Sequence, residues 1–266
     1  MPYYTEKDHT FVICAYKENV FLEETIKSLK NQTLKSRIIL STSTPNEYIK
    51  KLCEKYQIDF FINTAPKLAA TDWNFAYRQA KTKLITIAHQ DDIYEKNYLE
   101  EILKMANKCN NAILIFTDYY EYKLGKREKS NLLLKIKRII NFPLSFPVLG
   151  KSRFVRRRTL SIGCAICCPS VTFVADNTGF PVFDERYKNS CDYMTWVALA
   201  DRKGAFVYIR KQLVGHRIYA GSATSLNISE NIRMKEDYEI LCNFWPKPLA
   251  RIINKIYATS EKSNKV

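Results

Sequence analysis

The segment TFVICAYKENVFLEETIKSLKNQTLKSRIILSTS, residues 10–43, contains three patterns that decide the fold class. Residues 10–16 and 36–43 are short runs rich in apolar and β-branched side chains, which are typical of buried strands. Residues 21–32 between them repeat apolar side chains every three or four positions, which is the period of an amphipathic helix. The order strand, helix, strand predicts an α/β protein.

The same alternation continues through the first 122 residues. Further helices are predicted at 46–57, 71–80 and 96–108, and further strands at 59–64, 83–89 and 112–120. Thr44, Pro45 and Glu47 match a capping box that would begin the helix at 46–57. The pattern predicts a mainly parallel, Rossmann-like sheet flanked by helices, with ligands bound at the carboxyl ends of its strands.

Composition limits the class of protein. The chain has 266 residues, 46% of them hydrophobic, which is enough for one sizeable core with a smaller appendage.

The N-terminal MPYYTEKDHT lacks the apolar core of a signal peptide, so we expect eight reduced cysteines and a cytoplasmic location. CAICC, residues 164–168, favours buried thiols over a metal site, because no second cysteine pair has ligand spacing. The longest uncharged run, 159–175, is predicted to be a buried strand.

Positive charge is concentrated in one segment. Residues 123–158 contain twelve Lys and Arg and one Glu, a net +11 within the +15 of the chain. A helix at 132–140 would have one apolar face, made of Leu132, Leu133, Ile136, Ile139 and Ile140. Its other face would carry Lys135, Lys137 and Arg138. A C-terminal helix would likewise separate Trp245, Leu249, Ile252, Ile253, Ile256 and Tyr257 from Lys247, Arg251 and Lys255. Such helices bind anionic membranes or pack on the domain, and both interpretations remain open.

Two adjacent carboxylates follow the predicted strand at 83–89, in IAHQDDIYE, residues 87–95. Asp91 and Asp92 repel each other at a strand end, so a positive partner is expected there. No G-x-G-x-x-G and no G-x-x-x-x-G-K motif is present to hold phosphate by backbone N–H groups. A divalent cation held by the two carboxylates is the alternative way to neutralise a phosphate ligand.

Three ordered segments resemble the signatures of family 2 glycosyltransferases with the GT-A fold. They are residues 11–33, 73–103 and 190–225, and the resemblance covers most of 10–226. It implies an inverting, metal-dependent transferase that moves a sugar from a nucleoside-diphosphate sugar to a hydroxyl of a glycan or lipid-linked acceptor. It further implies Mn²⁺ or Mg²⁺, and a role in capsule or cell-wall polysaccharide synthesis at the inner face of the cell membrane.

The resemblance also assigns site residues. The donor would contact Ala15, Tyr16, Glu18, Asn74, Arg78, Asp91 and Arg217. Asp91 and Asp92 match the last two acids of the metal-binding D-x-D-D motif, and Asp192 matches the general base. Alternatives stay open for several of these positions: Asp192 suits a helix cap, Asn74 and Arg78 suit capping and solvation, and His216 suits either the metal or a hydrogen bond within its loop.

The chain departs from the family pattern in four places. LSTSTPN, residues 40–46, lacks the acids that usually help to read the nucleobase. His89, Cys191 and Tyr219 stand where an acid, a Glu and a His are usual. The donor sugar, nucleobase, acceptor, linkage and oligomeric state therefore stay open, whereas the metal-binding pair is retained.

Four segments are predicted: a nucleotide-sugar-binding half at 1–122, a basic insertion at 123–158, an acceptor-side half at 159–226 and a helical extension at 227–266. Two other functions compete with the transferase. An isoelectric point near 9.4 suits nucleic-acid binding, although no recognition motif is visible and we expect no nucleic-acid partner. The second alternative is an inactive relative that serves as an assembly partner.

Overall fold

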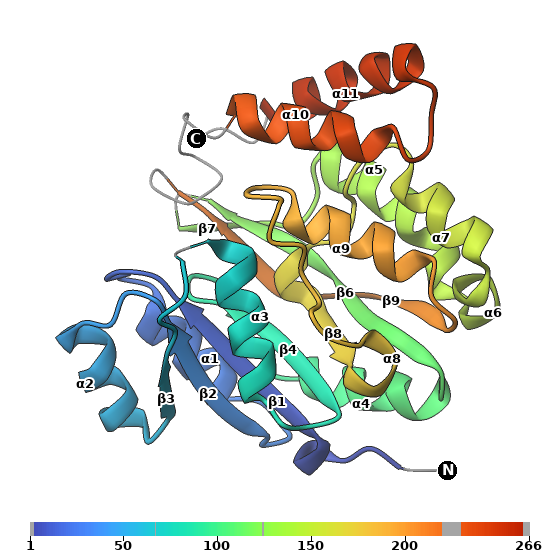
Figure 1. The fold of residues 1–266 in the computed structure, drawn as a ribbon. Coiled ribbons are helices and arrows are strands. Elements are labelled where there is room, and N and C mark those ends of the chain that lie inside the picture. Colours follow the sequence, from blue (N-terminus) through green and yellow to red (C-terminus); the bar gives the residue numbers. More distant parts are fainter. Residues whose placement is uncertain (1–2, 67, 124, 220–229, 263–266) are drawn as a thin grey trace.

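The structure is a computed structural model that describes residues 3–66, 68–123, 125–219 and 230–262 (Figure 1). The last residues of the third signature, 220–225, and the predicted boundary at 226/227 lie outside the described residues. Strands from both predicted halves join one sheet of nine strands in the described part of the chain. The halves at 1–122 and 159–226 thus share a single sheet.

The first four strands of the chain form a parallel block, as predicted. They are β1 (His9–Ala15), β2 (Arg37–Thr42), β3 (Asp59–Ile62) and β4 (Leu84–His89), in the order β3-β2-β1-β4. The connecting helices are α1 (Leu22–Lys30), α2 (Glu47–Tyr56) and α3 (Ala69–Gln79). Because the block is parallel, the carboxyl ends of its strands meet at one edge.

The rest of the sheet runs in both directions. Its strands are β5 (Ile93–Tyr94), β6 (Ala112–Lys123), β7 (Lys126–Glu128), β8 (Val171–Val174) and β9 (Ala205–Ile218). β8 inserts antiparallel between β4 and β6, and β9 then lies parallel to β6. β5 and β7 pair antiparallel with β9 and β6. The sheet is therefore mixed beyond its parallel block.

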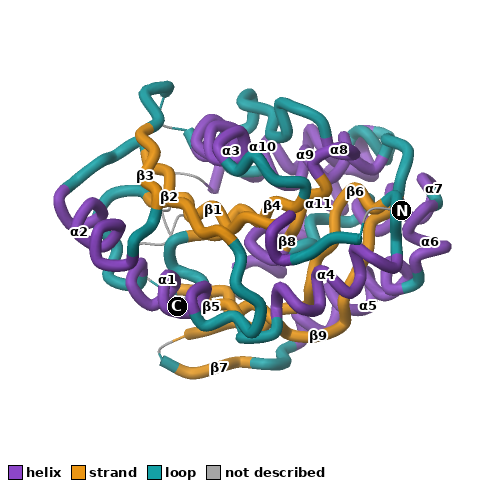
Figure 2. Tube along the Cα trace, turned by 90° about the horizontal axis from the view of Figure 1, so that it is seen from below, coloured by secondary structure: helices purple, strands orange, loops and turns teal. Residues whose placement is uncertain are grey.

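Helices cover both faces of the sheet (Figure 2). α1 and α4 (Tyr98–Lys108) enclose one hydrophobic core, and α3 and α9 (Cys191–Ala200) enclose the other. The remaining helical elements are η1 (Glu6–Asp8), α5 (Leu132–Asn141), η2 (Phe142–Ser145), α6 (Pro147–Lys151), α7 (Arg153–Leu160), η3 (Cys168–Ser170), α8 (Ala175–Thr178), α10 (Glu230–Leu241) and α11 (Lys247–Lys262). None of the described helices is long and apolar enough to cross a membrane.

Two local predictions are corrected. The run at 159–175 is a strand only at its end, in β8, because Gly163 with φ +133° and Pro169 interrupt it. The cap of α2 is Asn46, whose side chain accepts the Ile49 N–H over 2.9 Å. Thr44, the predicted cap, instead accepts the Lys17 N–H, because its side chain faces the end of β1.

The basic helices divide their apolar side chains differently from the prediction. In α5 the predicted apolar face is split: Leu133 is buried, as is Leu134 outside that face, whereas Leu132 and Ile139 are exposed. Two cations of the predicted basic face contact the protein: Lys137 donates to the Tyr119 hydroxyl, and Arg138 pairs with Asp118. In α11 the buried side chains are Ala250, Asn254 and Tyr257, and the exposed apolar ones are Leu249, Ile252 and Ile256.

Candidate active site

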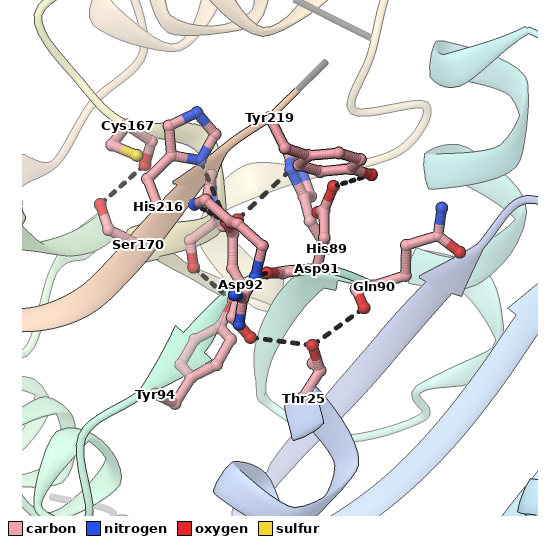
Figure 3. Close-up of polar contacts among 12 residues, drawn as sticks. Thr25, His89, Gln90, Asp91, Asp92, Tyr94, Cys167, Ser170, His216 and Tyr219 are labelled. Atoms are coloured by element: carbon pink, nitrogen blue, oxygen red, sulfur yellow. Dashed lines mark hydrogen bonds and ion pairs between the residues drawn. The ribbon is translucent and has the colours of Figure 1, made fainter. Parts of the chain in front are cut away.

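Asp91 and Asp92 lie in the turn that links β4 to β5, at the carboxyl edge of the parallel block (Figure 3). β5 pairs with β9, with Ile93 opposite Gly215, and this pairing brings His216 against the turn, as Figure 3 shows. Arg217 follows it on β9 and hydrogen-bonds to both acids of the turn. The two carboxylates predicted from the sequence therefore meet residues that follow them by more than a hundred positions.

The two oxygens of the buried Asp92 carboxylate have different surroundings. Oδ1 accepts the backbone N–H of Arg217 over 2.9 Å and hydrogen-bonds to Nδ1 of His216 over 3.1 Å. Oδ2 lies 3.7 Å from Nδ1 of His89 and has no hydrogen-bond partner among the described residues. One oxygen is fixed by the protein, and the other keeps its lone pairs for a ligand.

The two acids differ in their tendency to ionise. Burial and the negative charge of Asp92 raise the pKa of Asp91. Burial would raise the pKa of Asp92 as well, but His216, His89 and the Arg217 N–H outweigh it and lower that pKa. Burial alone would lower the pKa of His216, and Asp92 reverses this and raises it. The lowered pKa of Asp92 favours its ionised form, and the raised pKa of His216 favours a positive charge beside it.

His89 occupies the position where the family usually has an acid. Its ring stacks on Trp73, with centroids 5.1 Å apart and an interplanar angle of 18°. Burial lowers the pKa of His89, which favours the neutral imidazole. A neutral, stacked ring therefore replaces a third negative charge next to Asp92.

Tyr219 links Asp91 to the loop after β1. Its hydroxyl donates to Oδ2 of Asp91 over 3.0 Å and accepts from Nδ2 of Asn19 over 2.8 Å. Oδ1 of Asn19 accepts the Phe21 N–H over 2.9 Å, which anchors the amide at the start of α1. Tyr219, noted in the sequence only as a departure, thus orients one of the two acids.

Arg217 is nearly buried and its guanidinium is directed into the protein. Nε donates to the Asp91 carbonyl over 2.8 Å, and a terminal nitrogen donates to Glu24 over 2.6 Å. The guanidinium also lies over the rings of Phe21 and Tyr122, at 4.0 and 4.8 Å. The structure shows it fixing the acidic turn, and its predicted contact with the donor stays a prediction.

The predicted donor residues of the first segment lie at the same edge. Ala15 ends β1 and is buried, whereas Tyr16 and Glu18 follow it and are exposed. Gln90, immediately before Asp91, accepts the Tyr16 N–H over 2.9 Å and donates to the Tyr16 carbonyl over 3.1 Å. These two hydrogen bonds hold the end of β1 beside the acidic turn. Gln90 is labelled next to Asp91 in Figure 3.

Asn74 is occupied by backbone contacts. Its amide oxygen accepts the N–H groups of Val182 and Phe183 over 3.0 and 2.9 Å, and its nitrogen donates to the Phe183 carbonyl over 2.8 Å. Arg78 is exposed and lies over the Phe180 ring at 4.6 Å. Both residues thus support the 180–183 loop, and their donor contacts stay predictions.

Asp192 lies in the first turn of α9, where its Oδ1 accepts the Tyr193 N–H over 2.7 Å. The N-cap position of α9 is Ser190, so Asp192 lies within the first turn, where the helix dipole favours a carboxylate. Burial raises the pKa of the Cys167 thiol, and the negative charges of Asp92 and Asp192 raise it further. The assignment of Asp192 as general base stays a prediction.

Two further polar residues, Lys137 and Asp72, make contacts at this edge that were not predicted from the sequence. Lys137 of α5 donates to the Tyr119 hydroxyl over 3.1 Å, and the Tyr119 ring makes an edge contact with His216 at 6.3 Å. Asp72 of α3 accepts from Ser43 and from Asn63, each over 2.7 Å. Asp72 thus places a carboxylate beside the end of β2, where LSTSTPN has none. Amphipathic patterning could not reveal either contact, because both join separate elements.

Comparisons with known proteins agree with this architecture. An uncharacterized glycosyltransferase of Rickettsia prowazekii is 25% identical over 251 residues, which cover 91% of this chain and 72% of the relative. S. aureus TarS 1-349 in complex with UDP-GlcNAc has a similar fold, with a TM-score of 0.59 at 14% identity, over 93% of this chain and 70% of that one.

A mannosyltransferase from Pyrobaculum calidifontis, in complex with GDP-Man and Mn²⁺, gives a TM-score of 0.63 at 12% identity, over 96% of this chain and 70% of that one. These two likenesses confirm the predicted GT-A fold. The model of the family described as Glycosyl transferase family 2 matches residues 10–174, more than half of the sequence. The chain therefore belongs to glycosyl transferase family 2 and is a glycosyltransferase.

Proposed function

We propose that the protein transfers a sugar, with inversion, from a nucleoside-diphosphate sugar to a hydroxyl of a glycan or lipid-linked acceptor in surface polysaccharide synthesis. The observation that carries this proposal is the buried Asp92 carboxylate at the carboxyl edge, with one oxygen fixed and the other without a hydrogen-bond donor among the described residues. The relatives' donors, UDP-GlcNAc for TarS and GDP-Man for the mannosyltransferase, support a nucleotide-sugar substrate.

The donor set fits a divalent cation of the Mg²⁺ or Mn²⁺ type. Oδ2 of Asp92 has lone pairs that no donor in the described part of the chain engages, and the half-buried Asp91 precedes Asp92 in the same turn. The described residues include no group of three His, Cys, Asp or Glu that could hold a metal, which suits an ion that takes most ligands from phosphate and water. Asp92 and Asp91 would hold it, and bound there it would stabilise the negative charge of the leaving nucleoside diphosphate.

The contact between His216 and Asp92 restricts how His216 could contact a metal ion or a diphosphate. Its Nδ1 is engaged by Asp92, so only Nε2 can face a metal or a diphosphate. As the counter-charge of Asp92, the ring also holds that carboxylate in its ionised form. We assign this orienting role to His216 ahead of direct metal ligation.

The donor site is proposed along the edge from Ala15 and Tyr16 to Asp91. Glu18 and Tyr16 are exposed beside the acidic turn and offer contacts to a nucleoside. Asp72 supplies a carboxylate next to the end of β2, so we add it to the candidates for contact with the nucleobase. Asn74, Arg78 and Arg217 remain proposed donor residues that act through the elements they support.

Asp192 is proposed as the general base that takes the proton of the acceptor hydroxyl during attack. A carboxylate within hydrogen-bond reach contributes roughly 10²- to 10⁴-fold to such a step. The hydroxyl oxygen forms the new bond to the anomeric carbon as the bond to the diphosphate oxygen breaks. A base and a leaving group on opposite sides of that carbon give inversion in a single displacement.

One experiment tests the function. The protein is incubated with a panel of sugar nucleotides and Mn²⁺, and thermal stability and release of free nucleoside diphosphate are measured for each. We expect one donor to raise the melting temperature in the presence of Mn²⁺ and to be slowly hydrolysed. Binding of a donor without hydrolysis or transfer to any acceptor would instead support the inactive relative, and salt-sensitive binding to random DNA without donor binding would support the nucleic-acid alternative.

A further inference from the structure

Helix α5 turns an apolar stripe away from the protein. Leu132, Ile136 and Ile139 are spaced by four and three positions and so share one side of the helix. Leu132 is 76% exposed and Ile139 is 73% exposed, whereas Leu133 and Leu134 are buried. The apolar side of α5 that faces outward therefore has no partner in the described part of the chain.

The stripe continues beyond α5. Phe142, the first residue of η2, and Phe146, which follows η2, are also exposed, and their rings meet edge to face with centroids 5.4 Å apart. Val148 of α6 is 79% exposed, and Phe154 of α7 is also exposed. We call these seven side chains the α5–α7 face; its helices lie together at one end of the molecule (Figure 1). Its members are Leu132, Ile136, Ile139, Phe142, Phe146, Val148 and Phe154.

The apolar exposure is local. Of nineteen large hydrophobic side chains exposed in the described part of the protein, nine fall within residues 132–162. α11 adds a second outward stripe of Leu249, Ile252 and Ile256. Soluble proteins rarely expose large contiguous apolar surface, so a cluster of this kind indicates a contact with another molecule or a membrane.

Positive charge surrounds the α5–α7 face. The guanidinium of Arg210 lies 4.9 Å over the Phe142 ring, and that of Arg158 lies 5.3 Å over the Phe154 ring. A pocket of about 470 Å³ beside Phe154 is lined by Arg153, Phe154, Arg157, Arg158, Asn243 and Phe244. No Asp or Glu occurs in the sequence from 129 to 175. The partner must therefore be apolar and carry negative charge next to its apolar part.

We propose that the α5–α7 face docks on an anionic lipid bilayer. Its aliphatic and aromatic side chains would enter the boundary between headgroups and acyl chains, and the arginines would contact lipid phosphates. On its other side, α5 reaches the candidate active site through Lys137, which bonds to Tyr119 beside His216. Docking would hold the site next to the membrane, and the further step to a lipid-linked acceptor rests on the proposed function.

The test compares sedimentation with vesicles of phosphatidylcholine alone and of phosphatidylcholine mixed with phosphatidylglycerol. The variant Leu132→Ser/Ile139→Ser/Val148→Ser changes three highly exposed side chains of the face and touches no hydrogen bond. The matched control is Val20→Ser/Ile62→Ser, which changes exposed side chains elsewhere. We expect wild type and control to bind the anionic vesicles, and the triple variant to partition at least about tenfold less.

Two results would overturn the proposal: equal binding of the triple variant and wild type, or no binding of wild type to either vesicle. A dimer of wild type that the triple variant abolishes, with no vesicle binding, would assign the face to contact between copies of the chain. Donor hydrolysis is measured in parallel without vesicles. If wild type binds the anionic vesicles but hydrolyses no donor, the proposed function is contradicted and the docking surface is retained.

Discussion

The backbone N–H of Arg217 donates to Oδ1 of Asp92 over 2.9 Å, although the two residues are 125 positions apart. The contact exists because β5 pairs with β9, which carries Arg217 along the acidic turn. Since a backbone group makes it, the orientation of Asp92 does not depend on the side chain at position 217. The geometry of the carboxylate is set by the sheet itself.

Asp92→Asn tests the metal assignment at this carboxylate. The amide oxygen of Asn can still accept the Arg217 N–H, so the fold is retained, but the negative charge that a divalent cation requires is removed. We expect donor affinity in the presence of Mn²⁺ to fall at least about tenfold, with a smaller fall for Asp91→Asn. Calorimetric titration of a nucleoside diphosphate with and without Mn²⁺ measures both.

EDTA provides the control for that experiment. The wild-type protein in EDTA should bind the nucleoside diphosphate as weakly as Asp92→Asn does in Mn²⁺. Transfer activity that persists unchanged in EDTA would show that the acidic pair does not act through a metal.

Asn74→Ala separates structural support from donor binding. The buried amide makes hydrogen bonds to Val182 and to Phe183, and their loss leaves buried backbone groups without partners. We expect the free energy of unfolding to fall by about 2–3 kcal/mol. Donor affinity, measured at a temperature where the variant is folded, should change less than threefold if the role is support alone. A large loss of affinity in a stable variant would restore the donor-contact interpretation.

The parallel block could be predicted because each of its strands is a buried run and each connecting helix has one apolar side. The position of β8 could not, because it pairs with β4 and β6 after a separation of more than fifty residues in each case. Periodicity in α5 placed Leu132, Ile136 and Ile139 on one side of the helix but wrongly grouped the buried Leu133 with them. It did not show which face packs, because the inward side is decided by Asp118 and Tyr119 on another element.

The same limit applies to the site. Asp91 and Asp92 were found because they adjoin a strand end in the sequence itself. Tyr219 and Glu24 were not assigned as partners, because each meets the acidic turn or Arg217 only through tertiary contact. A sequence can place a residue at an edge, but hydrogen bonds that cross a hundred positions or more require the fold.

His9 gives a pH dependence of stability. Its ring is buried between Ser36 and Thr86, at 2.9 Å from each hydroxyl, and burial lowers its pKa to about 3. In the unfolded chain His9 has its ordinary pKa, near 6.5. Between pH 6.5 and 3 the unfolded chain therefore binds a proton at His9 that the folded chain does not, so the free energy of unfolding falls as the pH drops below 6.5. From pH 7.5 to 5.5 this group should lower the free energy of unfolding by about 1.4 kcal/mol.

Urea unfolding of wild type and His9→Gln at both pH values isolates this contribution. Gln keeps hydrogen-bonding capacity without titrating, so the variant should lose less stability on acidification. An identical loss in the two proteins would show that His9 is not the group responsible.

Arg156 holds the region between α6 and α9 together. Its buried guanidinium donates to the carbonyls of Gly150, Lys151, Ala200 and Arg202 at 2.8 to 3.0 Å. Arg156→Met keeps the length of the side chain and removes every one of these donors. We expect the free energy of unfolding to fall by at least about 3 kcal/mol, because several buried carbonyls lose partners.

The matched control for Arg156 lies on the same helix. Arg153 pairs with Asp201 at 2.7 Å, but both side chains are exposed, so Arg153→Met should cost less than about 1 kcal/mol. Denaturation curves of the two variants give the comparison. Similar losses in both would mean that the buried carbonyls are satisfied without Arg156.

Asp192→Asn distinguishes a general base from a helix cap. Asn has nearly the same volume and can still accept the Tyr193 N–H that Asp192 accepts over 2.7 Å, so the first turn of α9 and the fold should survive. It cannot take a proton from the acceptor hydroxyl, so kcat should fall on the order of 10²-fold or more, with donor affinity nearly unchanged. Melting temperature, donor affinity and transfer rate are measured on one preparation. A folded variant that binds donor and turns over within a few-fold of wild type would give Asp192 a structural role in the first turn of α9, and the base would have to be sought elsewhere along the carboxyl edge.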